Sequence, residues 1–139
     1  MNTFPLKVLS MKGVAFEGEV FSLTVPTEFG PTMIEYGYTN FIAALLPAGV
    51  MKVVNEKGTT YYAVFGGAVD VVKGGATTVY AEEINVGYEI DMARAMAARD
   101  RNLDRINSGS DEIDMVKAKA HLAKALIRIS VKRLSEGEL

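Results

Sequence analysis

The stretch from Glu89 to Leu134 decides the fold, and it reads EIDMARAMAARDRNLDRINSGSDEIDMVKAKAHLAKALIRISVKRL. It is rich in residues that favour helices, and only Asn107-Ser108-Gly109-Ser110 interrupts it. We therefore expect two helices folded back on each other at this interruption. Asp91 is suited to cap the start of the first helix, and segment 108–111 supplies a glycine C-cap and a second N-cap.

Both expected helices carry a stripe of residues at spacings of 4 and 3, which is typical of the seam between two paired helices. The stripes consist of Met92, Met96, Arg99, Leu103 and Ile106, and of Val116, Ala120, Ala123, Ile127, Ser130 and Leu134. Alanine is frequent around them, so the helices can approach closely but bury only about half the area of a leucine seam, at roughly 25 cal/mol per Å². We expect a hairpin that is marginally stable alone and able to move.

The second expected helix is basic, because no acidic residue lies between Met115 and Leu134. Residues 1–88 carry five basic and eight acidic side chains (net −3), and residues 89–139 carry ten and nine (net +1), which gives −2 for the chain. One interpretation is an ordinary solvated helix face, and the other is a surface that binds an acidic partner. The basic residues are Lys117, Lys119, Lys124, Arg128, Lys132 and Arg133.

Residues 1–88 differ from the helical stretch, because short β-branched segments there alternate with glycine and proline. Glu19–Val25, for example, alternates like a half-buried strand, and Gly66-Gly67 and Gly74-Gly75 are typical of hairpin turns. The pattern predicts an all-β sandwich or flattened barrel over residues 1–88, followed by an antiparallel two-helix hairpin over residues 89–139. Strands are expected at 6–11, 19–25, 33–35, 40–46, 50–54, 59–65, 68–72 and 76–81.

The composition argues against an enzyme. The chain has no cysteine and a single histidine, His121, which has no serine or aspartate placed to orient it. Glu82-Glu83 is expected to end a strand, and the acids at 111–114 to start a helix, so neither group predicts a metal site. No glycine-rich phosphate loop is present. We therefore expect no catalytic residue, no metal and no required cofactor.

The sequence also carries no sign of a membrane anchor. No apolar run approaches the roughly 20 residues of a spanning helix, and Met1–Pro5 lacks the pattern of a targeting segment. The absence of cysteine fits a reducing compartment. The expectation is a soluble intracellular protein that reaches a membrane only through its partners.

Several short motifs, taken in order, resemble the epsilon subunit of F-type ATP synthases over nearly the whole chain. Ile90 to Ala95, IDMARA, matches the junction motif [IL]DxxRA of that family in full. The corresponding segments of the β region are FEGEV at 16–20, TEFG at 27–30, FIAAL at 41–45 with Gly37 before it, GGAVDV at 66–71 and AEE at 81–83. The departures are Tyr36-Gly37-Tyr38 for Pro-Gly-His, Thr39-Asn40 for Ala-Pro, and an extra residue in Pro47-Ala48-Gly49.

The resemblance implies a non-catalytic rotor subunit of the central stalk. Its sandwich would bind the gamma subunit and the ring of c subunits, and so couple rotation to ATP synthesis driven by protons or sodium ions. Its hairpin would either fold against the sandwich or extend along gamma, where it inhibits ATP hydrolysis. The six basic residues of the second helix would then meet an acidic loop of a beta subunit in the head of alpha and beta subunits. Such a subunit lies at the cytoplasmic face of the bacterial inner membrane, without insertion.

In some members of this family the junction motif binds ATP as a regulatory ligand. The resemblance therefore implies a nucleotide site formed by Ile90, Asp91, Arg94, Ala95, Lys124 and Arg128. In this site the arginine and lysine side chains would reach phosphate, and the aspartate an amine or a ribose hydroxyl. The alternative is that Asp91 only caps the helix and Arg94 only ties it to the sheet. A glutamate that the family uses before the motif corresponds to Asn85, which counts against binding.

The lower loops of the sandwich depart most from the family. The acidic residue that the family is thought to use on the c-ring is Pro31 in this chain. Glu28 or Glu35 is expected to take its place, and Tyr38 stands where the family has histidine. The contacts with the c-ring and gamma are therefore expected at these four residues.

Two other functions stay open from the residues alone. One is a nucleic-acid-binding module that uses the basic hairpin, against which stand the net negative charge and the absence of aromatic residues along the basic stripe. The other is a small-molecule-binding β domain with a helical lid. No nucleic acid is expected as a partner if the resemblance holds.

Overall fold

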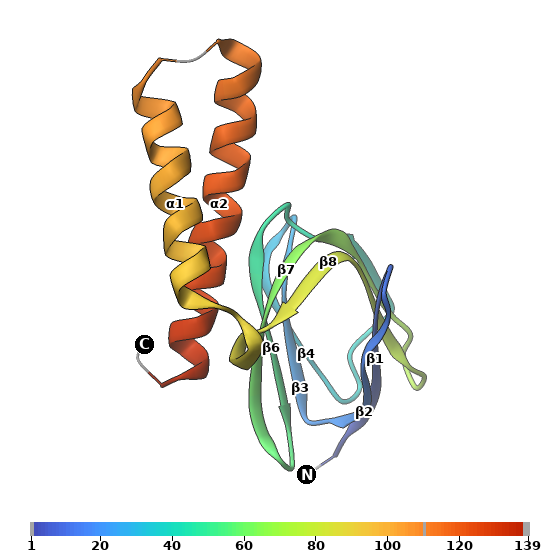
Figure 1. Cartoon of the computed structure of the whole chain (residues 1–139). Coiled ribbons are helices and arrows are strands. Elements are labelled where there is room, and N and C mark those ends of the chain that lie inside the picture. The colour runs from blue at the N-terminus through green and yellow to red at the C-terminus, as the bar shows by residue number, and fades with distance from the viewer. Residues whose placement is uncertain (1, 110, 138–139) are drawn as a thin grey trace.

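A computed structural model describes residues 2–109 and 111–137, so Ser110 of the predicted bend lies outside the described part. Eight strands are followed by one turn of 3-10 helix, η1 (Gly87–Glu89), and by two helices that stand as a hairpin beside the strands (Figure 1). This arrangement confirms the predicted fold class. The strands are β1 (Phe4–Ser10), β2 (Gly13–Val20), β3 (Ser22–Thr27), β4 (Gly30–Glu35), β5 (Phe41–Ala44), β6 (Gly49–Asn55), β7 (Gly58–Val71) and β8 (Thr77–Val86).

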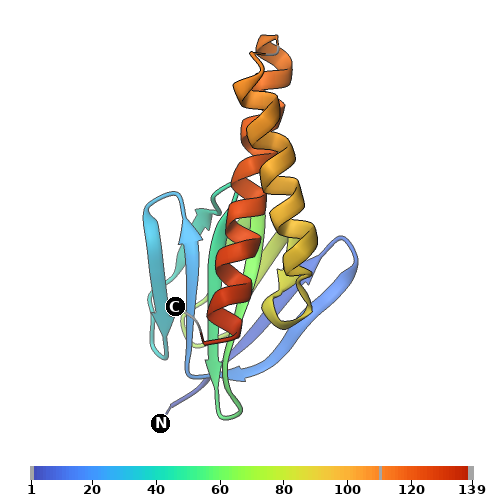
Figure 2. The same cartoon turned by 60° about the vertical axis from the view of Figure 1, so that its left-hand side comes forward.

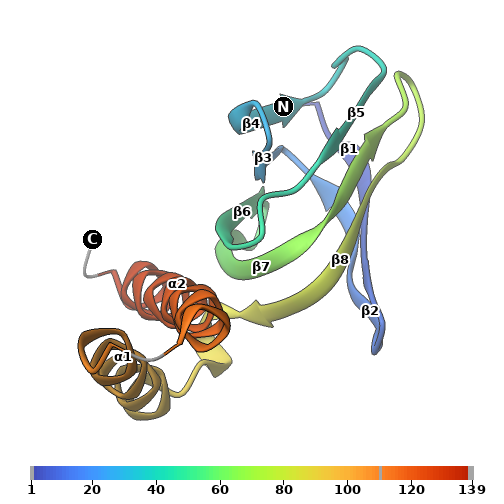
Figure 3. The same ribbon diagram turned by 90° about the horizontal axis from the view of Figure 1, so that it is seen from above.

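The strands form one hydrogen-bonded sheet in the order β2-β1-β8-β7-β6-β3-β4, and β5 pairs with β7 beside this path. Neighbouring strands are antiparallel except β1 and β8, which pair in parallel. Figure 3 shows the sheet curling on itself, so that its two halves face each other. The main core fills the space between them, and its fully buried members include Leu6, Leu23, Ile34, Met51, Val64 and Val79.

Strand β7 is 14 residues long and continues through Gly66-Gly67, so the hairpin turn predicted there is wrong. Both glycines have positive φ, +77° and +123°, which bends the strand without reversing it. The first part of β7 pairs with β6 and the last part with β5, while β8 follows both parts. A Cβ at Gly67 would lie 1.8 Å from the carbonyl oxygen of Tyr80, so this position requires glycine. The bend therefore lets one strand serve both halves of the sandwich.

Two strand boundaries also differ from the prediction. The segment predicted as one strand over 19–25 is divided at Phe21, where the chain leaves β1 and joins β4 and β6. Strand β8 continues past Glu82-Glu83 to Val86, so these acids lie within a strand and not at its end. The extension matters for the site below, because it carries Glu83 and Asn85 to the helices.

The hairpin consists of α1 (Met92–Asn107) and α2 (Glu112–Ser135). Both helices begin at an aspartate, as predicted for Asp91. Asp91 Oδ1 accepts a hydrogen bond from the backbone N–H of Arg94 at 3.1 Å, and Asp111 Oδ1 accepts one from that of Asp114 at 2.9 Å. Gly109 after α1 has φ +72°, the left-handed conformation of a C-terminal cap. The ends of both helices are thus set by local sequence.

The predicted seam between the helices is wrong at four of its eleven positions, because the structure leaves these four side chains exposed: Leu103, Val116, Ala120 and Ala123. In α2, Ala118 and Ala125 are buried, whereas Val116 is 65% exposed. In α1, Ala95 is buried, whereas Leu103 is 39% exposed. The physical reason is that α2 packs against two partners, α1 and the sheet, and that small side chains occupy the close contact between the helices.

Helix α2 lies on the outer face of β6 and β7, while α1 packs on α2 farther from the strands (Figure 2 and Figure 3). A second apolar cluster fills the contact between α2 and the sheet. It consists of Ala63 and Phe65 from β7, Ile90 before α1 and Val131 from α2, with Ile127 packed beside them. Because successive strand residues face opposite sides, β7 serves both this cluster and the main core. Within the described ranges, neither helix has the length and hydropathy needed to cross a membrane.

Candidate functional site

A groove of about 1260 Å³ runs between the helical hairpin, strand β8 and the turn that joins β1 to β2. Its lining includes all of the residues predicted to bind a nucleotide: Ile90, Asp91, Arg94, Ala95, Lys124 and Arg128. The first four lie just before α1 or in its first turn, and the last two come from α2, about thirty residues later in the chain. The fold therefore brings the predicted nucleotide residues to one place.

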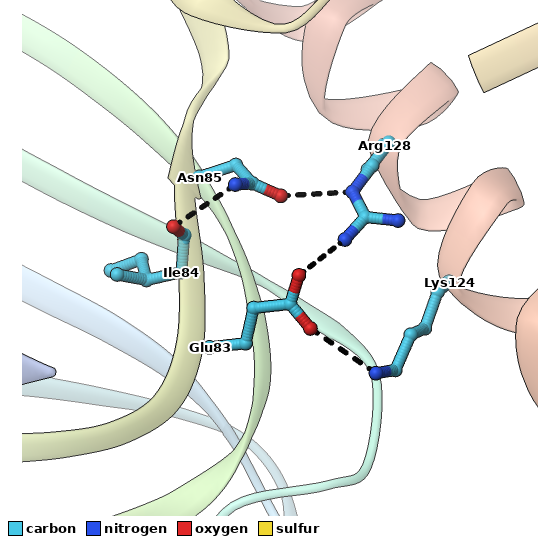
Figure 4. Close-up of polar contacts among 5 residues, drawn as sticks. All are labelled: Glu83, Ile84, Asn85, Lys124 and Arg128. Carbon is cyan, nitrogen blue, oxygen red and sulfur yellow. Dashed lines mark hydrogen bonds and ion pairs between the residues drawn. The ribbon is translucent and has the colours of Figure 1, made fainter. Parts of the chain in front are cut away.

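Glu83 of β8 holds two of these residues. Its Oε2 accepts a hydrogen bond from Arg128 Nη2 at 2.7 Å, and its Oε1 accepts one from Lys124 Nζ at 3.2 Å (Figure 4). Arg128 also donates from Nε to Asn85 Oδ1 at 2.8 Å, and the Asn85 amide donates to the carbonyl oxygen of Ile84 at 3.1 Å. We call Glu83, Asn85, Lys124 and Arg128 the strand–helix cluster.

The two cations of this cluster also lie over the aromatic ring of Phe65. The Arg128 guanidinium lies 4.5 Å from the centroid of the Phe65 ring, and Lys124 Nζ lies 5.3 Å from it. Phe65 is 2% exposed and belongs to the apolar cluster under α2. Each cation is therefore attracted both by the Glu83 carboxylate and by the face of the ring. Polar and apolar contacts of α2 with the sheet thus meet at one point.

On the α1 side of the groove, the side chains make fewer polar contacts within the described part of the chain. Asp91 accepts the cap hydrogen bond from Arg94 N, and within the described part of the chain the Arg94 guanidinium has no ion-pair or hydrogen-bond partner. Asn102 is 2% exposed, donates to the carbonyl oxygen of Ala98 at 2.7 Å, and leaves its own Oδ1 without a partner among the described residues. The Arg94 guanidinium is therefore available to a ligand in the groove, whereas the Asn102 amide oxygen is buried.

The groove as a whole is basic. Six basic side chains line it against three acidic ones, so its formal charge is +3 with His121 neutral. Such a potential attracts anions. The basic residues are Lys12, Arg94, Arg101, Arg105, Lys124 and Arg128, and the acidic residues are Glu83, Glu89 and Asp91.

The basic residues of α2, predicted to face a beta subunit, divide into two groups. Lys124, Arg128 and Lys132 turn toward the sandwich, where Lys132 Nζ donates to the carbonyl oxygen of Tyr88 at 3.2 Å and pairs with Glu136 at 3.4 Å. Exposed side chains make up the second group, which is Lys117, Lys119 and Arg133. In this arrangement only half of the predicted contact surface faces outward.

The residues predicted for the c-ring and gamma lie on the β3–β4–β5 edge. Glu28 accepts a hydrogen bond from Ala44 N at 3.2 Å in the turn between β3 and β4, and Pro31 follows it in β4. Glu35 is the last residue of β4 and Tyr38 follows three residues later, and both line a cavity of about 380 Å³. The Phe41 ring stands between the two groups, 6.0 Å from the Tyr38 ring and 6.2 Å from the Phe29 ring.

Two tyrosines, Tyr62 and Tyr88, also line the groove. Burial raises the pKa of the Tyr62 phenol above its usual 10.0, and the neighbouring Tyr88 phenol raises it further. Tyr62 is 5% exposed, whereas Tyr88 is 68% exposed. The pair therefore offers a buried neutral hydroxyl beside an open aromatic face.

Comparison with known proteins places this chain in a family. A model described as ATP synthase, Delta/Epsilon chain, beta-sandwich domain matches residues 3–86, and one described as ATP synthase, Delta/Epsilon chain, long alpha-helix domain matches residues 89–133. The chain belongs to the delta/epsilon chains of ATP synthase. As a delta/epsilon chain it is a stalk subunit of the synthase and not a catalytic one.

Two solved structures share the fold of this delta/epsilon chain. A chain in the structure of the Euglena gracilis mitochondrial ATP synthase, OSCP/F1/c-ring, is 20% identical with a TM-score of 0.79, over 96% of this chain and 81% of that chain. A chain in the central stalk and c-ring of the Tetrahymena thermophila mitochondrial ATP synthase is 13% identical with a TM-score of 0.61, over 94% and 97%. At these identities the likeness shows the shared fold.

Sequence reasoning missed the partner of the basic helix in this delta/epsilon chain. It placed Glu83 at the end of a strand and Phe65 within a strand, and it assigned no role to Asn102. The one local signal was the spacing of Lys124 and Arg128, which places both on one face of a helix. Their partner lies 41 and 45 residues away, so no local pattern could find it.

Proposed function

We propose that this delta/epsilon chain is a rotor subunit whose hairpin is a releasable brake on ATP hydrolysis. Its sandwich binds the gamma subunit and rests on the c-ring, and its hairpin inhibits hydrolysis after it leaves the sandwich. One observation carries the proposal: α2 is attached to the sheet through the strand–helix cluster and the apolar cluster around Phe65, while most of the sandwich core lies elsewhere. The hairpin is therefore separable from the domain that carries it.

The partners follow from the family and from the charges. Both similar structures contain a c-ring and one is of the central stalk, which supports a place for this chain in the central stalk next to the c-ring. Once α2 leaves the sheet, Lys124, Arg128 and Lys132 join the exposed lysines and arginine on one basic helix. An acidic loop of a beta subunit within the alpha and beta head is the partner of that helix. The location is the cytoplasmic face of a bacterial inner membrane, held through the complex, with protons or sodium ions as the coupling ion.

Removal of the hairpin tests this function. In the assembled synthase, a chain ending at residue 88 is expected to copurify with gamma, because the main core consists of residues between Phe4 and Ala81. ATP hydrolysis by that complex is expected to exceed that of the complex with the full chain. Unchanged hydrolysis would reject the braking role, and loss of gamma binding by both chains would reject the rotor role.

The groove supports a second function, the binding of ATP as a regulatory ligand. Six residues predicted for a nucleotide site line one basic groove, and this is the observation that favours it. Arg94, with its open guanidinium, is suited to phosphate, and Asp91 is suited to a ribose hydroxyl or an amine. Tyr88 in the same groove has an exposed ring that is suited to stack on the base. A bound nucleotide would join α1, α2 and β8, and so favour the folded arrangement.

Titration of the isolated chain with labelled ATP tests the nucleotide site. Arg94→Ala is expected to weaken binding by about tenfold or more, because a hydrogen bond between charged groups is lost. Arg99→Ala is the matched control, since Arg99 lies on the same helix outside the groove and pairs with Asp100. Equal affinities of the two variants would reject the site.

A further inference from the structure

We propose that Glu83 is an internal latch: its carboxylate fastens α2 to the sandwich, and it competes with phosphate for the same two cations. The holding role stands on the contacts of this chain alone. The competing role rests on the proposed binding of a nucleotide in the groove. Together the two roles mean that Glu83 sets how much negative charge a ligand must carry to bind in the groove.

The spacing of side chains along β8 and along α2 brings the residues of the latch together. Residues 83 and 85 are two apart on β8, so both side chains point to the same face of the strand. Residues 124 and 128 are four apart on α2, so both point to one face of the helix. The two faces meet, and the result is three hydrogen bonds of 2.7–3.2 Å between β8 and α2. Each donor is charged, which makes these bonds stronger than neutral ones.

The surroundings strengthen the latch beyond an isolated surface ion pair. The side chains of Lys124 and Arg128 are 36% and 27% exposed, and that of Glu83 is 46% exposed. A lone pair with this exposure would contribute little, because water screens it. Here one carboxylate bridges two cations, and both cations also lie 4.5–5.3 Å from the centroid of the buried Phe65 ring. A network of this kind is worth more than its separate pairs.

Competition with phosphate follows from the donors that Glu83 occupies. Arg128 Nη2 and Lys124 Nζ point at its two oxygens, and these are the atoms that a phosphate group in the groove would use. A carboxylate attached to the same chain acts at a high effective concentration, on the order of millimolar. A ligand with one charge competes poorly with it, whereas a triphosphate engages Arg94 as well and can displace it. Glu83 therefore favours nucleoside triphosphates over less charged anions.

Glu83→Gln tests both roles, and Glu82→Gln is its control. Both changes remove one negative charge from neighbouring positions of β8, but Glu82 lies outside the groove, over Gly66 of β7. Opening of α2 is followed through the thiol introduced by Ala63→Cys, which is fully buried beneath α2 in a chain without other cysteines. Global unfolding is followed through Val79→Cys, buried in the main core.

We expect Glu83→Gln to affect the thiol under α2 and not the thiol in the main core. Glu83→Gln raises the rate at which the thiol at position 63 is alkylated by about tenfold and leaves the rate at position 79 unchanged, because only the helix is released. High salt gives the wild type a similar increase, since salt screens the latch. Glu83→Gln also binds ATP more tightly than Glu82→Gln does, and it discriminates less between ATP and AMP.

Each other outcome counts against one role. Equal alkylation rates for Glu83→Gln and Glu82→Gln overturn the latch, as do equal increases at positions 63 and 79. Faster alkylation with no ATP binding by any variant rejects the nucleotide proposal and leaves the holding role intact. As a second variant, Lys124→Gln should add little to Glu83→Gln, because the first change has already broken the pair. Fully additive effects of the two substitutions overturn the pairing.

Discussion

At the scale of a single residue, burial in the groove raises the pKa of the Tyr62 phenol. Its phenol keeps its proton to higher pH in the folded chain than in the unfolded chain. Above pH 10 the unfolded chain loses this proton while the folded chain retains it. The free energy of unfolding therefore falls as pH rises past 10, by up to about 1.4 kcal/mol per pH unit for one group.

Tyr62→Phe should remove this alkaline loss of stability. We expect the free energy of unfolding of the variant to fall less steeply than that of the wild type between pH 10 and pH 11, because no phenol titrates at this position. Urea unfolding at several pH values measures it. Tyr80→Phe on the exposed face of β8, where Tyr80 is 50% exposed, is the matched control. Parallel pH profiles of the wild type and Tyr62→Phe would contradict the expectation.

At the same scale, the sequence predicts contacts between residues that are close in the chain and misses contacts between residues that are far apart in it. Asp91 was predicted as a cap because the N–H group it accepts from is three residues away. The role of Glu83 was not predicted, because its partners follow more than forty residues later. The nucleotide residues were placed through a family resemblance, and the fold then brought them together. Residue types alone would not have joined Arg94 to Arg128.

At the scale of elements, periodicity predicted the two helices and most strands but not how they pack. The stripe of Val116, Ala120 and Ala123 has the right spacing for a seam, yet it is exposed. Spacing identifies a face of a helix and leaves open which partner covers it. A helix that packs against two partners needs two apolar faces. In an alanine-rich helix, the sequence does not show which apolar face packs against which partner. Gly66-Gly67 was misjudged for a related reason, since positive φ serves a bend as well as a turn.

At the scale of the whole molecule, the contact between hairpin and sandwich sets the free energy of release. Undocking α2 exposes Phe65 and Val131, each worth roughly 1.5–3 kcal/mol when fully buried. The latch adds to this cost. An isolated chain is therefore expected to keep its hairpin folded most of the time, and extension requires a partner that binds the released helix more tightly than the sheet does.

A covalent lock tests whether release is needed for braking. Lys132 Nζ reaches the carbonyl oxygen of Tyr88, so a short bismaleimide should join the thiols introduced by Tyr88→Cys and Lys132→Cys, which are the only thiols in the chain. In the assembled synthase, the linked chain should leave ATP hydrolysis as high as the chain ending at residue 88 does, because α2 cannot leave the sheet. Each single cysteine variant, treated in the same way, should inhibit hydrolysis more than the linked chain does, because its α2 can still leave the sheet. A linked chain that still inhibits hydrolysis would show that the folded hairpin itself is the brake, and would overturn the requirement for release.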